Sequence, residues 1–137
     1  MAQKAEGTQP VEIRGRLLRW SLVAYSVLVL VLSLYPDPRE LIPPQWNLTD
    51  TALHFAGYLP LGVLLALALP LSARGSLGRL VLTALAAIAV GALYGAALEI
   101  GQAFVGRTAD VRDAAVNVAG LSVGVVAVSA ARLIRRT

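Results

Sequence analysis

The stretch EIGQAFVGRTADVRDAAVN, residues 99–117, joins two long apolar runs of a 137-residue chain. The runs consist mostly of Leu, Ala, Val and Gly, whereas the stretch gathers charged and amide side chains. Such groups are costly to place beside membrane-spanning segments, and they commonly mark functional sites. We therefore take this stretch as the organising part of the molecule; its polar residues are Glu99, Gln102, Arg107, Asp110, Arg112, Asp113 and Asn117.

The composition indicates an integral membrane protein. Hydrophobic residues make up 57% of the chain and charged residues 15%, whereas soluble domains usually carry about a quarter charged residues. The formal charge is +4, but the arginines lie at segment ends, without the basic stripe of a nucleic-acid-binding protein. No nucleic-acid partner is therefore expected. The absence of cysteine excludes disulfides and thiolate metal sites.

The apolar runs predict an all-α fold with four transmembrane helices. The first covers about residues 20–35. We interpret it as a retained helix rather than a signal peptide, because the run is long and no small-residue cleavage pattern follows it. The others cover about residues 50–71, 80–98 and 114–134. Residues 1–13 are predicted to form a disordered cytoplasmic tail, and residues 14–137 a single four-helix domain.

The segments between these runs predict where helices begin and bend. Prolines at positions 36, 38, 43 and 44 predict an extended loop before the second helix. Asn47 or Thr49 can cap the second helix, and Asp110 can cap the fourth. Pro60 lies inside the second helix, where the loss of a backbone hydrogen bond predicts a kink.

The charge distribution predicts the orientation. Lysine and arginine dominate the two tails and the second connection, whereas the first and third connections carry most of the carboxylates. By the positive-inside rule, both termini are cytoplasmic and residues 99–117 face outward.

Helical spacing places the polar residues on shared faces, because residues three and four apart are neighbours. The small-x-x-x-small pairs Gly91/Gly95 and Gly120/Gly124 predict close helix packing, and they continue into the polar positions 99, 113 and 117. Three helix ends are expected to meet in an outward pocket made of Asp50, His54, Tyr58, Glu99, Gln102, Arg107, Asp113 and Asn117.

Each candidate residue also has a structural interpretation. His54, Asp113 and Asn117 could simply hold helices together by hydrogen bonds, and Glu99 could be an interfacial carboxylate. Arg107 could form an internal salt bridge with Glu99 or Asp113. Alternatively, its planar guanidinium could clamp a phosphate or carboxylate.

The residues leave the chemistry open. One histidine with several carboxylates could bind a divalent cation, but without cysteine this is a weak zinc signature. The same histidine could act as a general base, although no partner nucleophile stands out. No Walker or dinucleotide-type glycine loop is present. Neither a catalytic residue, a metal nor a cofactor is assigned on these grounds.

Two blocks of the sequence resemble the VanZ-like family of bacterial membrane proteins. The first is Asp50-Thr-Ala-Leu-His54-Phe55-Ala-Gly-Tyr58-x-x-Leu61-Gly62. The second is Glu99-x-x-Gln102-x-Phe104-x-Gly106-Arg107-Thr108-Ala109-x-x-x-Asp113-x-x-x-Asn117-x-x-Gly120-x-x-x-Gly124. The chain departs from the usual pattern at Thr51, where Lys commonly follows the Asp, at Asp110, where Ser is frequent, and before Gly106, where Pro is usual.

The resemblance implies a small multi-helix protein of the bacterial cytoplasmic membrane. The founding member of the family is associated with low-level resistance to the glycopeptide antibiotic teicoplanin. We expect the pocket to bind or process an anionic cell-envelope molecule, such as a lipid-linked phosphate or a glycopeptide-related ligand. Arg107 would engage the anion, and the residues His54, Glu99, Asp113 and Asn117 would orient it or transfer protons.

The competing hypothesis is a structural or partner-binding membrane subunit in which the same residues lock helices together. Membrane lipid is the expected surrounding, and the chain could dimerise through lipid-facing surfaces. An ion or proton path is disfavoured, because the polar residues gather at one end of the helices.

Overall fold

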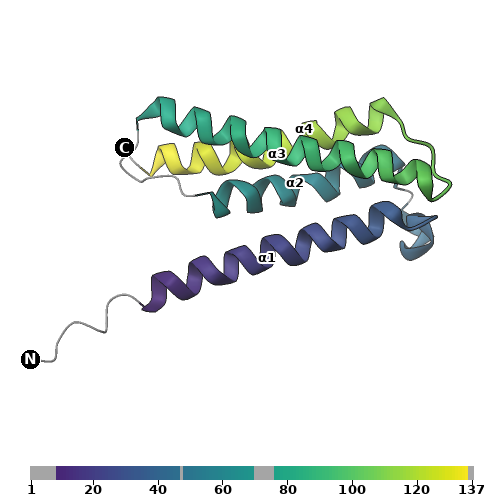
Figure 1. The fold of residues 1–137 in the computed structure, drawn as a ribbon, viewed down its shortest axis with the longest axis horizontal. Coiled ribbons are helices and arrows are strands. Elements are labelled where there is room, and N and C mark those ends of the chain that lie inside the picture. Colours follow the sequence, from purple (N-terminus) through teal and green to yellow (C-terminus); the bar gives the residue numbers. More distant parts are fainter. Residues whose placement is uncertain (1–8, 47, 70–75, 136–137) are drawn as a thin grey trace, which may run out of the picture.

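The computed structural model describes residues 9–46, 48–69 and 76–135. The long helices are α1 (Gln9–Leu34), α2 (Asp50–Ala68), α3 (Leu77–Phe104) and α4 (Val111–Ile134), and two 3-10 helices lie between α1 and α2 (Figure 1). Each long helix is long and apolar enough to cross a membrane. The predicted all-α membrane fold with four transmembrane helices is therefore confirmed.

The helix boundaries differ from those expected. Helix α1 begins at Gln9, so its first turn falls in the segment predicted to be a tail, and residues 1–8 lie outside the described part. Helix α3 continues past Leu98 to Phe104, because this segment contains no proline and the left-handed glycine that follows the helix is Gly106. The basic turn around residue 74 also lies outside the described residues.

Two of the predicted helix caps are confirmed. The Thr49 hydroxyl accepts a hydrogen bond from the Ala52 backbone N–H at 3.2 Å and so caps α2. The Asp110 carboxylate accepts one from the Arg112 backbone N–H at 2.8 Å and caps α4. These caps fix where the polar ends of α2 and α4 begin.

The extended loop predicted between α1 and α2 is wrong. The connection contains two 3-10 helices, η1 (Pro38–Leu41) and η2 (Pro44–Trp46). A proline at the first position of a helical turn has its backbone already near the helical φ and loses no internal hydrogen bond. Prolines therefore begin these turns, and the connection folds back over the bundle end.

Glycines allow α2 and α4 to pack backbone against backbone. A Cβ added at Gly120 would lie 2.6 Å from the carbonyl oxygen of Phe55. Cβ atoms at Gly62 and Gly124 would likewise collide with the backbone of the opposite helix. This close approach agrees with the small-x-x-x-small pattern of α4.

On α3 the glycines make room for side chains. A Cβ at Gly91 would lie 2.5 Å from Leu121, and a Cβ at Gly95 would lie 3.1 Å from the ring of Tyr58. Leu121 and Tyr58 are both buried. The glycine stripe of α3 thus receives the core side chains of α2 and α4.

Helix α1 is attached to the other helices along one half only. In Figure 1 it diverges from them toward the end where it begins. Val29 is the one buried side chain among residues 12–34. Tyrosines also hold the attached half, since Tyr25 donates to the Gly57 carbonyl at 2.9 Å and Tyr94 to the Ser26 carbonyl at 2.5 Å.

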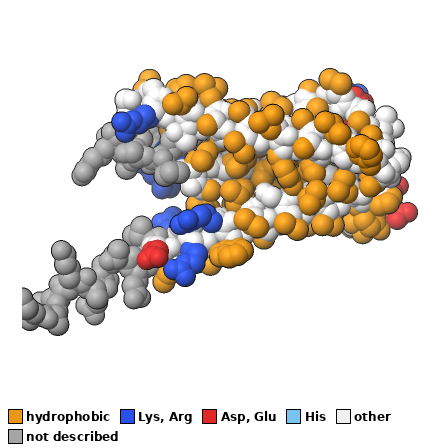
Figure 2. Space-filling model, in the orientation of Figure 1, with side chains coloured by type: hydrophobic (Ala, Val, Ile, Leu, Met, Phe, Trp, Pro, Cys, Tyr) orange, Lys and Arg blue, Asp and Glu red, His pale blue; other side chains and the backbone are white. Residues whose placement is uncertain are grey.

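Charge separates between the two ends of the molecule. In Figure 2 most arginine side chains on the visible face lie at the end where α1 begins, together with one acidic side chain, and the other visible acidic side chains lie at the opposite end. The four helices alternate in direction, so the start of α1 and the end of α4 lie at the same end (Figure 1). Which end faces the cytoplasm stays a prediction of the positive-inside rule.

Candidate functional site

A left-handed glycine shapes the end of α3. Gly106 has a φ of +78°, a conformation that other residues adopt at a cost. The backbone N–H groups of Val105 and Arg107 both donate to the carbonyl of Gln102, at 3.1 and 3.0 Å. A left-handed glycine followed by a bond back to the last turn is the Schellman ending of a helix. This turn folds Arg107 back over α3, beside Gln102.

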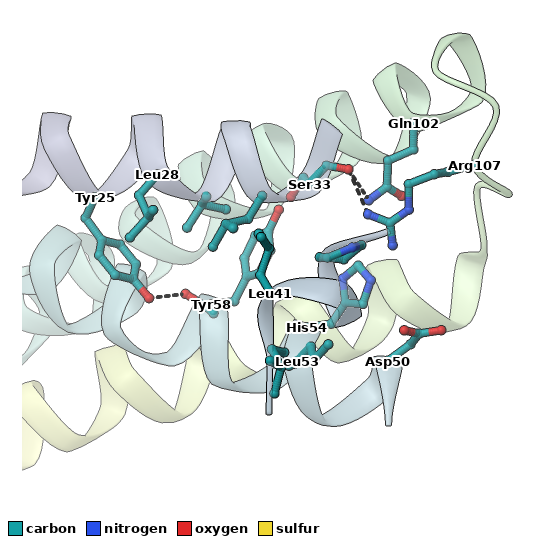
Figure 3. Close-up of a pocket in the computed structure, with 15 residues that line it drawn as sticks. Tyr25, Leu28, Ser33, Leu41, Asp50, Leu53, His54, Tyr58, Gln102 and Arg107 are labelled. Carbon is teal, nitrogen blue, oxygen red and sulfur yellow. Dashed lines mark hydrogen bonds between the residues drawn. The ribbon is translucent and has the colours of Figure 1, made fainter. Parts of the chain in front are cut away.

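Arg107 and Gln102 together hold the end of α1 (Figure 3). Nη1 of Arg107 lies 2.9 Å and Nε2 of Gln102 lies 3.1 Å from the carbonyl oxygen of Ser33, in the last turn of α1. Carbonyls in the last turn lack intrahelical partners and carry partial negative charge, which favours a cation there. Arg107 therefore ties α1 to the segment that follows α3.

The salt bridge considered for Arg107 is not formed. Within residues 9–46, 48–69 and 76–135, Arg107 makes no ion pair with Glu99 or Asp113. Both carboxylates instead face His54. Arg107 instead bonds the Ser33 carbonyl, and its role as an anion-binding group stays a prediction.

His54 is the centre of a polar network that joins three helices. Its Nδ1 lies 3.0 Å from Oδ1 of Asn117, and Nδ2 of Asn117 donates to Oε1 of Glu99 at 3.1 Å. Its Nε2 lies 3.6 Å from Oδ2 of Asp113. Helix α2 supplies His54 and α3 supplies Glu99, whereas Asp113 and Asn117 are one turn apart on α4.

The hydrogen bonds define the protonation of this network. Asn117 uses its amide N–H to bond the Glu99 carboxylate, so its amide oxygen faces His54 and must accept. His54 therefore carries a proton on Nδ1. Its Nε2 is then directed toward the Asp113 carboxylate.

Two buried polar atoms near the network have no partner among the described residues. These are the hydroxyl of Tyr58 and Oε2 of Glu99, on side chains of residues that are only 2% and 6% exposed. A Cβ at Gly95, one turn before Glu99, would lie 3.3 Å from the Tyr58 hydroxyl. Burying an unpaired polar group costs about 1–3 kcal/mol, so water or a ligand atom would stabilise this region.

An apolar cavity of about 310 Å³ lies between α1, η1 and α2. Gln102 and Arg107 line one end, and Tyr25 and Leu28 lie at the other end (Figure 3). Tyr58 lines the cavity between them. The cavity is therefore mainly hydrophobic, with its charged, imidazole and amide side chains at one end.

A second pocket of about 390 Å³ adjoins this cavity and is polar. The two share Pro38, Asp50 and Arg107 as lining residues, so they meet at the guanidinium. The other charged residues lining the second pocket are Asp37, Asp110 and Asp113. An apolar cavity thus opens into an acidic pocket that contains one arginine.

The structure divides the eight predicted site residues into three groups. Five line the apolar cavity: Asp50, His54, Tyr58, Gln102 and Arg107. Asp113 lines the acidic pocket. Glu99 and Asn117 line neither of these two pockets; they are buried and bonded to each other and to His54.

Sequence reasoning missed the contribution of α1 and η1. It expected a pocket built by the second, third and fourth helices, but Tyr25, Ser33 and Leu41 also line the cavity. A tyrosine inside an otherwise apolar run is the one signal that pointed to α1. Ser33 takes part through its backbone carbonyl. Every residue has this group, so the residue type does not reveal the contact.

The described residues do not converge on a metal site. Among them, no group of three or more His, Cys, Asp and Glu side chains is arranged to hold a metal ion. No serine or threonine hydroxyl of the described part hydrogen-bonds His54 either, so the geometry does not supply an activated nucleophile. The arrangement offers the imidazole of His54 and the guanidinium of Arg107 as hydrogen-bonding groups at the cavity.

Comparison with protein families shows that the chain matches the family model described as VanZ/LLP1 over residues 20–134. This range includes all four helices apart from the beginning of α1. The curated proteins and the solved structures gave no match.

Proposed function

The chain belongs to the VanZ/LLP1 family, and on that basis we propose that it binds the phosphate-bearing head of a cell-envelope lipid. The lipid chain lies in the apolar cavity between α1 and α2. The phosphate meets Arg107 at the shared mouth of the two pockets, next to His54. The pocket faces outward from the cytoplasmic membrane, in the orientation favoured by the charge distribution.

The main support for this proposal is the shape and lining of the cavity. It is mostly apolar along its length and has Arg107 at one end. Its lining on α1 runs from Tyr25 to Ser33, which corresponds to about 12 Å of helix at 1.5 Å per residue. Half of a hydrocarbon core of roughly 30 Å is about 15 Å. The cavity is therefore about as deep as one leaflet, the depth that a lipid chain occupies.

The chemistry of Arg107 supports a phosphate at the mouth. A guanidinium presents five N–H donors in a planar fork that matches phosphate oxygens, and the bond to Ser33 uses Nη1. His54, which also lines the cavity, would donate from Nε2 when it carries a second proton. Both groups are held by bonds to backbone or side chains, so they are positioned before the ligand arrives.

A second candidate function has its own supporting observation. The hydrogen bonds among His54, Asn117 and Glu99 join α2, α4 and α3, as expected of a subunit whose polar residues only lock helices together. The unpartnered hydroxyl of Tyr58 and the adjoining cavity favour the ligand-binding function, because a purely structural network would satisfy its own polar groups.

Lipid binding to the purified protein tests the proposal. Native mass spectrometry would compare phosphatidylglycerol with diacylglycerol of the same chains. Arg107→Ala should weaken phosphatidylglycerol binding about tenfold or more, since a charged hydrogen bond contributes about 1.5–3 kcal/mol. Arg112→Ala removes the same charge from an exposed position that lines neither pocket of Arg107, so it should bind like wild type.

A further variant separates ligand binding from helix capping. Gln102→Ala removes the parallel bond to the Ser33 carbonyl but keeps the guanidinium. It should weaken the attachment of α1 but keep the preference for phosphatidylglycerol over diacylglycerol, which Arg107→Ala is expected to lose. Equal binding of both lipids by wild type, or unchanged binding by Arg107→Ala, would overturn the proposed function. Glycopeptide resistance of cells that express the same variants can be measured separately from lipid binding.

A further inference from the structure

One of the two tyrosines that line the apolar cavity has a buried hydroxyl without a partner. The Tyr25 hydroxyl donates to the Gly57 carbonyl at 2.9 Å. The Tyr58 hydroxyl has no hydrogen-bond partner among the described residues, and Tyr58 is only 2% exposed. Buried polar groups in proteins nearly always have such a partner. The Tyr58 hydroxyl therefore indicates a ligand that accepts a hydrogen bond at this point of the cavity.

We propose that the ligand is a glycerolipid with ester-linked acyl chains, and that the Tyr58 hydroxyl donates to one of its ester carbonyls. This inference rests on the proposed function, which places the phosphate at Arg107 and a lipid chain in the cavity. A polyprenyl phosphate has the same phosphate, but its chain is a hydrocarbon without an oxygen. Such a chain would leave the Tyr58 hydroxyl unpaired, so the site recognises how the chain is linked to the head.

The position of Tyr58 along α2 fits the position of an ester in such a lipid. His54 lies next to the proposed phosphate site, and Tyr58 lies one turn further along α2, a step of about 6 Å. In a glycerophospholipid only the glycerol separates the phosphate from the ester carbonyls, and hydrocarbon follows. The cavity likewise has Arg107 at one end, Tyr58 in between, and Leu28 at the other end (Figure 3).

The ring of Tyr58 is held in place by packing. A Cβ added at Gly95 on α3 would lie 3.1 Å from the ring, so a glycine there lets the ring approach α3 closely. The ring also belongs to a core cluster with Val29, Leu61, Leu98 and Leu121. The hydroxyl hydrogen can still rotate toward an acceptor. A donor that is already positioned loses little conformational entropy when the ligand binds.

Glu99 supplies an alternative explanation for the Tyr58 hydroxyl. Its Oε2 is also buried without a partner among the described residues, and Gly95, against which the Tyr58 ring packs, lies one turn before it on α3. A water molecule between the two oxygens would satisfy both without a lipid. The ester is the better partner, because Tyr58 lines the cavity and Glu99 does not. The two explanations differ in whether Tyr58 affects the choice of lipid.

The test is a titration of the full-length protein with diester and diether phosphatidylglycerol of equal chain length, followed by native mass spectrometry. The diether lipid keeps the head group and the hydrocarbon but lacks the carbonyls. Wild type should bind the diester lipid about two- to tenfold more tightly, which corresponds to about 0.5–1.5 kcal/mol for one neutral hydrogen bond. This comparison needs no variant, so it does not depend on whether a variant folds.

Tyr58→Phe is the matched variant, since it removes the hydroxyl and keeps the ring. It should bind the two lipids equally, with the affinity that wild type has for the diether lipid. Tyr35→Phe is the control that removes a hydroxyl elsewhere. Tyr35 is 37% exposed and lines neither the apolar cavity nor the acidic pocket, so this variant should keep the wild-type preference for the diester lipid.

The outcomes separate this inference from the proposed function. Equal binding of the two lipids by wild type would overturn the bond to an ester. A preference that Tyr58→Phe retains would overturn it as well, and a loss of stability in that variant would then favour the water bound to Glu99. Loss of phosphatidylglycerol binding in Arg107→Ala would still support the proposed function in both cases. If Arg107→Ala binds phosphatidylglycerol like wild type, the proposed function fails and this inference fails with it.

Discussion

Nδ1 of His54 on α2 lies 3.0 Å from Oδ1 of Asn117 on α4, and the same Asn117 amide donates to Glu99 on α3 at 3.1 Å. One amide thus uses both of its ends to join three helices. Asn117 is only 2% and Glu99 only 6% exposed, so the bond between them is shielded from solvent. The network therefore holds the position of the His54 ring in the wall of the cavity.

Asn117→Ala should destabilise the protein by about 1–3 kcal/mol, the cost of leaving buried partners without a hydrogen bond. The measurement is reversible unfolding in mixed micelles of increasing denaturing detergent. Ser129→Ala is the control on the same helix, since the buried Ser129 hydroxyl has no hydrogen-bond partner among the described residues and its removal should cost little. Equal stability of the Asn117→Ala variant and wild type would show that the bonds do not hold the helices.

Gly124→Ala should destabilise the protein by about 1–3 kcal/mol through overpacking, because its Cβ would collide with the backbone of Leu59 on α2. Backbone atoms cannot move aside as a flexible side chain can. Gly57→Ala should be neutral or stabilising, since a Cβ there meets no atom within 4 Å and alanine favours a helix. The same unfolding assay distinguishes the two, and a neutral Gly124→Ala would contradict the close α2–α4 packing.

Gly57→Leu should block the cavity without disrupting the fold. Gly57 lines the apolar cavity, and the space around its Cβ position is open. The larger side chain should reduce lipid binding severalfold while the unfolding midpoint stays close to that of wild type. Lipid binding and stability are measured on the same preparation. Full lipid binding by a folded Gly57→Leu variant would place the lipid elsewhere.

Gly106→Ala should cost about 1–2 kcal/mol, because its φ of +78° is left-handed. The variant should also weaken lipid binding, since the turn at Gly106 brings Arg107 to the cavity mouth. Gly106→Asn should lose less on both measures, because asparagine tolerates this conformation better than alanine. An alanine variant that binds and unfolds like wild type would argue against the role of the turn.

Much of the fold could be predicted from local patterns. The apolar runs predicted the four helices, and the spacing of Gly120 and Gly124 predicted the packing of α4. Thr49 and Asp110 were recognisable as caps because their oxygens reach the first backbone N–H groups of the next helix. These features depend on residues close together in the sequence.

The features that were missed depend on contacts between distant segments. The attachment of α1 uses backbone carbonyls of Ser26 and Ser33 as acceptors, and every residue carries such a group. The prolines of the first connection were interpreted as helix breakers, although they begin 3-10 turns. The cavity follows from both features, because η1 and the end of α1 form one side of it.

The most direct test of lipid binding by the apolar cavity is an experimental structure of the full-length protein in a bilayer of native-like lipid, at side-chain resolution. We predict continuous density for a lipid chain between Leu28 and Tyr58, leading to a phosphate within hydrogen-bond distance of the Arg107 guanidinium. A cavity closed by α1 packing against α2, with Arg107 bonded only to protein, would contradict the account and favour a helix-locking role for the polar network.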